Sequence, residues 1–206
     1  DTLSKMTDED LVANKYKHPK NMNDPEEIKA FYERFTAKEE SSEPEIQLKL
    51  WNNYYLWAEK YYGHNDKRTV DILENMTRAL RDKPSIYNNK YLVMAWVLYS
   101  KHVDRPLDVF KWMEEHKIGE QWYIFYTQYA NILERTIRDF RKVDKIYRTG
   151  LEKVEANKVE KVHKAYSEFA DRMRKRIQEV KENSSVLDLD NNVEYSNTTS
   201  DNYSKR

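Results

Sequence analysis

The chain has 206 residues, which is enough for one sizeable domain with further length for terminal segments. Its 36 Lys and Arg residues equal its 36 Asp and Glu residues, and this balance excludes a general nucleic-acid binder, which needs an excess of cations. The absence of Cys excludes disulfides and thiolate chemistry, and only 3 Gly and 5 Pro favour an all-α fold over one rich in turns and phosphate loops.

The first segments along the chain are polar. Residues 1–23 lack sustained periodicity, so we expect a flexible N-terminal arm. Residues 24–40 begin with a capping residue, a Pro and two acids and continue with a short apolar stripe, which predicts an N-terminal flanking helix. The stretch Ser41 to Pro44 then interrupts the helical pattern.

Residues 44–182 carry a series of helix-period patterns separated by short breaks. A helix from about Glu45 to Tyr62 is followed by a turn and by a second helix that ends near Pro84. Residues 88–119 contain two helices, which divide at Asp104-Arg105-Pro106 and end at Gly119, a residue suited to a left-handed cap. Two further helices are marked by Trp122, Phe125, Tyr126, Tyr129 and Leu133 and by Phe140, Val143, Tyr147, Gly150 and Leu151.

The connections are short, so neighbouring helices should form antiparallel hairpins, and these recur at about the 34-residue spacing of tetratricopeptide repeats. Gly150 occupies a position where a small residue lets two helices approach closely. The last stripe, Val162 to Val180, faces a strongly charged side and predicts a capping helix. We therefore predict an all-α, tetratricopeptide-like solenoid of about three repeats with a capping helix at each end, followed by a disordered linker over residues 183–206.

The most apolar stretch is Leu92 to Tyr99, far shorter than the about 20 residues that a membrane-spanning helix needs, so we expect no membrane segment. It is apolar all round, and such a helix must be covered by neighbours or keep one face for a partner. An exposed aromatic ring of this stretch, paired with Trp112 on the next helix, would create an apolar groove of the kind that binds amphipathic peptide helices.

No pattern of catalytic chemistry occurs in the chain. The 5 His residues are scattered and form no metal-binding pair at helical spacing, and neither a Gly-rich phosphate loop nor a nucleophile elbow is present. We expect no catalytic residue, no metal and no cofactor in this segment. The basic run Arg172 to Arg176 is interpreted as a solvated helix face.

Several segments occur in the order and spacing of one known domain. Over residues 45–177 the chain resembles the N-terminal tetratricopeptide-like region of the Bub/BubR/Mad spindle-assembly-checkpoint family. The segments are Trp51-Asn52-Asn53-Tyr54-Tyr55-Leu56-Trp57, Ile72-Leu73-Glu74, Tyr87-Asn88-Asn89-Lys90-Tyr91-Leu92, Trp96, Pro106-Leu107-Asp108-Val109-Phe110, Ile118-Gly119 and Phe125-Tyr126.

The resemblance implies a non-catalytic module that docks onto amphipathic helical motifs of the outer-kinetochore scaffold (the Knl/Spc family). It also implies a nuclear and cytoplasmic protein that is recruited to kinetochores in mitosis. Carried over by position, the partner-binding role falls on Trp96, Tyr99, His102 and Trp112. Trp96 can serve either packing or the partner, and the chain departs from the family at Tyr99 and His102, where apolar residues are common.

In the Mad/BubR branch, a Lys-Glu-Asn box in front of the repeats blocks the anaphase-promoting complex with its co-activator. Here that tripeptide occurs after the repeats, at Lys181-Glu182-Asn183, where we interpret it as a coincidence, with a degron-like contact to the co-activator as the alternative. The Bub-kinase branch and the BubR/Mad branch both stay open, and a kinase or pseudokinase domain could follow in the full-length protein.

Two other interpretations compete with the checkpoint module. A half-a-tetratricopeptide scaffold for RNA processing shares the Trp-x-x-Tyr spacing of Trp51 to Tyr54, but it predicts many copies and a basic surface. A co-chaperone domain that clamps an acidic C-terminus needs Lys, Arg and Asn along its inner face, where this chain has mainly aromatic and aliphatic residues.

Overall fold

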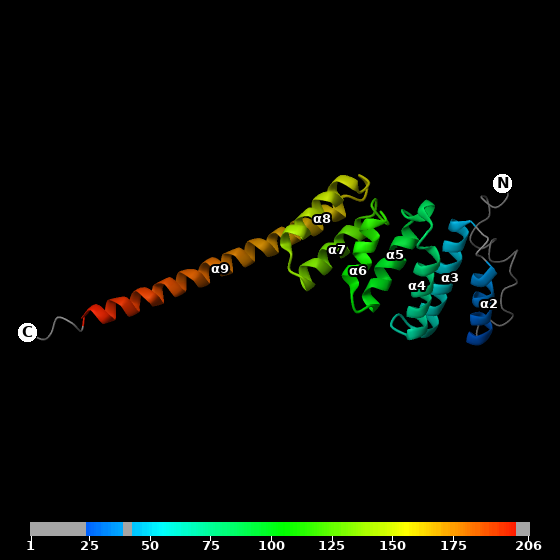
Figure 1. Cartoon of the computed structure of the whole chain (residues 1–206), viewed down its shortest axis with the longest axis horizontal. Coiled ribbons are helices and arrows are strands. Elements are labelled where there is room, and N and C mark those ends of the chain that lie inside the picture. Colours follow the sequence, from blue (N-terminus) through cyan, green and yellow to red (C-terminus); the bar gives the residue numbers. More distant parts are fainter. Residues whose placement is uncertain (1–23, 39–42, 201–206) are drawn as a thin grey trace, which may run out of the picture. The chain divides into compact units, whose positions relative to one another are not determined.

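The structure is a computed structural model that describes residues 24–38 and 43–200. In this part of the chain every regular element is a helix, which confirms the predicted all-α class (Figure 1). The predicted arm, residues 1–23, lies outside the described residues. The α-helices are α2 (Pro25–Lys38), α3 (Pro44–Tyr62), α4 (Lys67–Leu80), α5 (Lys90–Tyr99), α6 (Pro106–Glu115), α7 (Tyr123–Thr136), α8 (Phe140–Lys153) and α9 (Glu160–Ser200), and the short 3-10 helices are η3 (Pro84–Ile86) and η4 (Ser100–His102).

Three of the repeat helices, α4, α5 and α8, begin at residues whose side chains satisfy free backbone N–H groups. Asp66 Oδ1 accepts a hydrogen bond from Arg68 N at 2.9 Å at the start of α4, and Asn89 Oδ1 accepts one from Tyr91 N at 3.0 Å at the start of α5. Pro occupies the first turn of α3 and α6, where its missing N–H would have no helical partner. The sequence breaks therefore become helix boundaries close to the predicted positions.

Consecutive helices form hairpins: α3 with α4, α5 with α6 through η4, and α7 with α8. The first helices of successive hairpins also contact each other, α3 with α5 and α5 with α7. Figure 1 shows α2 to α8 following one another in chain order, with α2 against α3 at the N-terminal end. The predicted tetratricopeptide-like solenoid of three hairpins is thereby confirmed.

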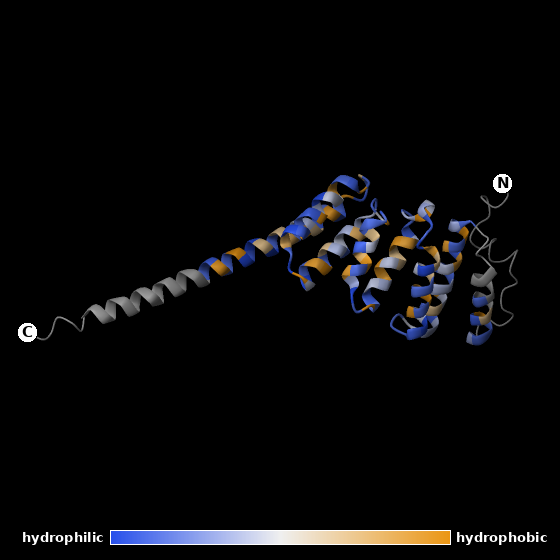
Figure 2. Cartoon of the chain, viewed as in Figure 1, coloured by the Kyte–Doolittle hydropathy of each residue, from blue (hydrophilic) through white to orange (hydrophobic). Residues whose placement is uncertain are grey.

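The core of the hairpins is continuous from one repeat to the next. Hydrophobic residues alternate with hydrophilic ones along these helices (Figure 2), and the hydrophobic ones supply the buried side chains. The rings of Phe110 and Tyr129 stack at 5.4 Å between their centroids and join the second hairpin to the third. Fully buried side chains include Leu48, Leu73, Leu80, Leu92, Phe110, Met113, Tyr129 and Leu133.

Two glycines allow neighbouring segments of this core to pack closely against each other. A Cβ atom on Gly150 would lie 2.8 Å from Tyr126 Cγ, so the predicted close contact of two helices at this residue is present between α7 and α8. Gly119 has φ +81°, the left-handed conformation expected for it, and its N–H donates a hydrogen bond to Tyr87 O at 2.9 Å. Both positions exclude a larger side chain.

The helix α9 belongs to a compact unit, residues 160–206, that is separate from residues 1–159. The sequence predicts an end near Lys181 and then a linker, whereas the structure continues the helix to Ser200. No Pro or Gly occurs between Glu160 and Ser200, so no residue that breaks a helix ends it earlier. Ile177 and Val180 are exposed on this helix, and its predicted capping role stays a prediction.

Candidate docking site on the second hairpin

The four residues expected to bind a partner lie on one continuous segment of the second hairpin. Trp96 is in α5, Tyr99 ends α5, His102 ends η4, and Trp112 is in the last two turns of α6. Tyr99, His102 and Trp112 are half-buried, so part of each ring faces outward. Trp96 differs because only 7% of its surface is exposed.

The burial of Trp96 assigns it chiefly to packing. Its ring lies edge-on to the Tyr99 ring with 6.4 Å between centroids, so the two rings pack against each other. The apolar pattern assigns Leu92, Ala95 and Leu98 chiefly to packing between repeats; Leu92 and Ala95 are buried, whereas Leu98 is only half-buried. A helix that is apolar all round gives no sequence signal for which of its aromatic rings faces out.

His102 belongs to a pair of histidines that the sequence does not reveal. Its ring lies 5.2 Å from the ring of His64, which comes from the turn between α3 and α4. Burial lowers the pKa of His102, and the nearby charges of His64 and Lys101 lower it further. The lowered pKa favours the neutral form of the His102 ring.

A carboxylate holds His64 in place. Glu59 Oε1 lies 3.2 Å from His64 Nδ1 and also accepts a hydrogen bond from Tyr55 Oη at 2.9 Å. Burial raises the pKa of Tyr55, and its hydrogen bond to Glu59 and the charge of that group raise it further. The first and second hairpins thus meet at His64 and His102.

The other two rings also have defined neighbours. Burial raises the pKa of Tyr99, and the charge of Glu74 on α4 contributes in the same direction. Glu74 pairs with Arg78 at 2.5 Å, which places a charged pair of α4 near the Tyr99 ring. The ring of Trp112 stacks on His116 with 3.5 Å between centroids, so one face of the indole is already covered.

Ring nitrogens without partners gather on this segment. Within the described residues, Trp96 Nε1, His102 Nε2 and Trp112 Nε1 are buried and have no hydrogen-bond partner. Leaving a buried polar group unpaired typically costs about 1–3 kcal/mol, so such atoms are uncommon in folded proteins. These three atoms lie on α5, η4 and α6 of the second hairpin.

The remaining sequence candidates lie elsewhere. Lys181 and Glu182 are exposed on α9, where Glu182 Oε1 accepts a hydrogen bond from Gln178 Nε2 at 2.6 Å, while the side chain of Asn183 lies outside the described residues. In the described part of the chain no cluster of three His, Asp or Glu residues could hold a metal ion. There, too, no helix has both the length and the hydropathy to cross a membrane.

The chain was compared with known protein families and sequences. The model of the family described as Mad3/BUB1 homology region 1 matches residues 26–151. Over 128 residues the chain is 27% identical to the mitotic spindle checkpoint component mad3 of Schizosaccharomyces pombe and 25% identical to the mitotic checkpoint serine/threonine-protein kinase BUB1 beta of Homo sapiens. Each match covers 61% of this chain but only 41% and 12% of the two relatives, so the chain spans less than half of either.

Two solved structures resemble the fold. The conserved N-terminal domain of the mitotic checkpoint component BUB1 matches 73% of this chain and 78% of its own chain, with a TM-score of 0.64 and 18% identity. A chain in the crystal structure of the Mitotic Checkpoint Complex matches 74% of each, with a TM-score of 0.60 and 25% identity. The first likeness supports the helical-repeat fold alone, since its sequence identity is low.

The match over residues 26–151 covers more than half of the chain and includes all three hairpins. It decides between the checkpoint interpretation and the two competing ones, the RNA-processing scaffold and the co-chaperone clamp. The chain belongs to the Mad3/BUB1 homology region 1 family, whose members are helical protein-interaction domains of spindle-checkpoint components.

Proposed function

We propose that this chain is the docking module of a mitotic checkpoint protein, and that it binds a helical motif of an outer-kinetochore scaffold of the Knl/Spc family. By this contact the module brings its parent protein to kinetochores in mitosis. The proposal is supported by the family match and by relatives that are named as mitotic checkpoint components. A structural neighbour within the Mitotic Checkpoint Complex is consistent with further checkpoint proteins as partners.

The observation that carries the proposal is the row of half-buried rings with unpaired ring nitrogens on α5, η4 and α6. His102 Nε2 and Trp112 Nε1 are already shielded from water in the free domain. An apolar helix that covers these rings therefore breaks no hydrogen bond between these two nitrogens and water, and it removes apolar ring surface from solvent. Ordered aromatic rings of this kind are typical centres of binding energy in protein interfaces.

The test is a calorimetric titration of the chain with synthetic peptides that cover the helical motifs of Knl/Spc-family scaffold proteins. Trp112→Ala should weaken the binding of a responsive peptide about thirtyfold or more, because aromatic anchors commonly contribute at least 2 kcal/mol on truncation. Tyr99→Ala, at the exposed end of α5, should weaken binding in the same direction. Its smaller buried surface makes it the second variant if Trp112→Ala alters folding.

A matched control is Tyr91→Ala, which removes an aromatic side chain that is 47% exposed on the same helix α5 but outside the proposed site. It should leave peptide affinity unchanged. Thermal unfolding of each variant separates lost binding from lost folding. The proposal fails if no peptide binds, or if the Tyr91 and Trp112 substitutions weaken binding equally.

A further inference from the structure

A pocket lies at the opposite end of the repeats from the third hairpin, between α2, α3 and α4. Its volume is about 330 Å³, and α2 contributes Lys29 and Glu33 to its lining. The pocket is separate from the docking site on the second hairpin, since none of its lining residues comes from α5, η4 or α6. It has no role in the function proposed above.

The floor of the pocket is aromatic and comes from one helix, α3. Trp51, Tyr54 and Tyr62 all line it, and the rings of Trp51 and Tyr54 lie 6.4 Å apart. The faces of such rings carry partial negative charge, which attracts a cation placed over them. Three aromatic rings in one pocket favour a ligand with a flat, cationic group.

The structure already contains one example of this recognition. The guanidinium of Arg68 lies over the Tyr62 ring, with its Cζ atom 3.7 Å from the ring centroid. The same guanidinium forms two parallel hydrogen bonds to Asp66, Nε to Oδ1 at 2.9 Å and Nη2 to Oδ2 at 3.0 Å. Arg68 is therefore paired with Asp66, and the other cation of the lining, Lys29, lies 3.9 Å from the Glu33 carboxylate.

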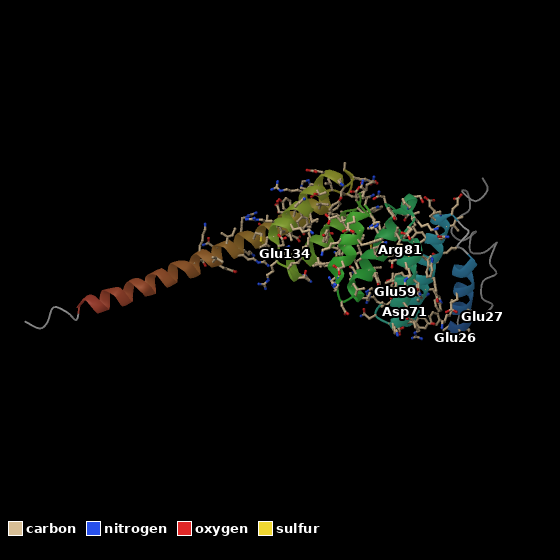
Figure 3. All side chains as sticks on the ribbon, viewed as in Figure 1. Glu26, Glu27, Glu59, Asp71, Arg81 and Glu134 are labelled. Atoms are coloured by element: carbon tan, nitrogen blue, oxygen red, sulfur yellow. The ribbon has the colours of Figure 1, made fainter. Side chains whose placement is uncertain are left out.

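In the described part of the chain, one carboxylate of the pocket lining, that of Asp71, has no cation beside it. Asp71 and Asn75 lie one turn apart on α4 and line the pocket, and within the described residues neither side chain has a hydrogen-bond or ion-pair partner. Figure 3 labels Asp71 on α4 and Glu26 on α2 at the same end of the hairpin. The lining holds two carboxylates, Glu33 and Asp71, and two cations, Lys29 and Arg68. Because Lys29 pairs with Glu33 and Arg68 pairs with Asp66, Asp71 is the carboxylate left for a ligand.

We infer that this pocket binds an arginine side chain presented by a partner protein. The guanidinium would stack on the ring of Trp51 or Tyr54 and donate hydrogen bonds to the Asp71 carboxylate and to the Asn75 amide oxygen. Arginine fits better than lysine because a planar guanidinium both stacks on aromatic rings and forms paired hydrogen bonds to a carboxylate. The site would thus give the domain a second contact with a partner, at the end where α2 meets the repeats.

The inference is tested on the full chain by following the indole N–H resonance of Trp51 in NMR spectra, assigned by its loss in Trp51→Phe. Blocked arginine (N-acetyl-arginine amide) is titrated in, and blocked citrulline serves as its uncharged isostere. We expect a saturable shift with arginine and none with citrulline. Asp71→Asn should weaken arginine binding about three- to fivefold, as expected for one solvent-accessible ion pair.

Asp82→Asn is the matched control, since it removes one carboxylate just beyond the end of α4, where Asp82 pairs with Arg81 outside the pocket. It changes the net charge of the chain by the same amount and should leave arginine binding unchanged. The inference is overturned if arginine gives no saturable shift, if citrulline gives the same shift, or if Asp71→Asn and Asp82→Asn behave alike. None of these outcomes depends on binding at the second hairpin.

Discussion

At the scale of single residues, the surroundings of the His102 side chain favour one of its two protonation states. Its Nε2 atom is buried without a partner, and its ring faces His64, whose Nδ1 lies 3.2 Å from Glu59. Protonating His102 would place a second positive charge beside His64 and Lys101, in surroundings that are partly dehydrated. The folded domain therefore favours the neutral ring.

This preference predicts a pH dependence of stability. The pKa of His102 is lowered by folding, chiefly through burial, so around pH 6 the unfolded chain binds more protons at this residue than the folded chain. Its contribution is complete above the ordinary His pKa of about 6.5 and is lost as the pH falls below that value. His102→Leu should flatten the decline of the unfolding free energy between about pH 7.5 and pH 5.5, measured by urea unfolding.

The control for this measurement is His163→Leu, because His163 is exposed on α9. Its variant should retain the decline of the wild-type chain. An unchanged slope in His102→Leu would contradict the account given for the His64–His102 pair.

At the scale of single elements, α5 depends on its first turn more than its sequence indicates. The helix is only ten residues long, and its most apolar residues are needed for packing rather than for helix formation. Asn89 Oδ1 accepts the hydrogen bond of Tyr91 N at 3.0 Å and so fixes the start of the helix. The position of Tyr99, at the other end, follows from this start.

We therefore expect Asn89→Ala to lower the unfolding free energy by about 1 kcal/mol, the usual effect of removing a side-chain cap. Asn89→Asp should retain the stability, because a carboxylate is an equally good cap and interacts favourably with the helix N-terminus. Asn65→Ala, at an exposed residue of the turn before α4, is the neutral comparison in urea unfolding. Equal losses in Asn89→Ala and Asn89→Asp would argue against the cap.

The helices were largely predictable, because their boundaries depend on residues close to them in the sequence. Pro44 and Pro106 begin helices, and Gly119 adopts the left-handed conformation expected of it. The continuation of α9 beyond Lys181 was not expected, because composition indicates a preference for disorder but places no breaking residue there. Local rules therefore define where helices start better than where a helix without a stop signal ends.

The candidate site was predictable only in part, for reasons of distance along the chain. The resemblance selects the segment from Trp96 to Trp112, but the burial of Trp96 depends on neighbours that no local pattern specifies. His64 of the first hairpin contacts His102 of the second, and the separation of the two residues along the sequence does not predict that contact. Helical periodicity identifies a face of one helix, whereas a site made by two hairpins needs the packing itself.

At the scale of the whole set of repeats, the second and third hairpins are joined by the loop between α6 and α7. Trp122 Nε1 donates a hydrogen bond to Asn88 O at 2.6 Å, and the Nζ atom of Lys158 lies 3.9 Å from the centroid of the Trp122 ring. Gly119 N donates to Tyr87 O at 2.9 Å in the same place. In a stack of repeats such contacts couple the unfolding of one unit to that of the next.

Trp122→Phe keeps an aromatic ring but removes this hydrogen bond, so the unfolding free energy should fall by about 1 kcal/mol. The transition in urea should also become broader, with a lower dependence on denaturant, because the two hairpins no longer unfold as one unit. Trp51→Phe, at a partly exposed Trp of the first hairpin, is the matched substitution and should leave the transition sharp. A Trp122→Phe transition as steep as that of the wild type would show that this loop does not couple the repeats.

The change of winding from α5 to η4 has a consequence for the spacing of the proposed docking surface. In a 3-10 helix, side chains three residues apart lie directly above one another, so η4 with Tyr99 as its N-cap residue places Tyr99 and His102 on one side of the segment. Three residues at a rise of about 2.0 Å advance this segment by about 6 Å. Four residues of an α-helix advance by the same distance, about 6 Å. Side chains four residues apart on one face of a bound helix would therefore have the same spacing as the two rings. One residue inserted between Tyr99 and His102 would change the spacing of the two rings, so that it no longer equals the spacing of side chains on a bound helix. The residues of the surface would stay the same.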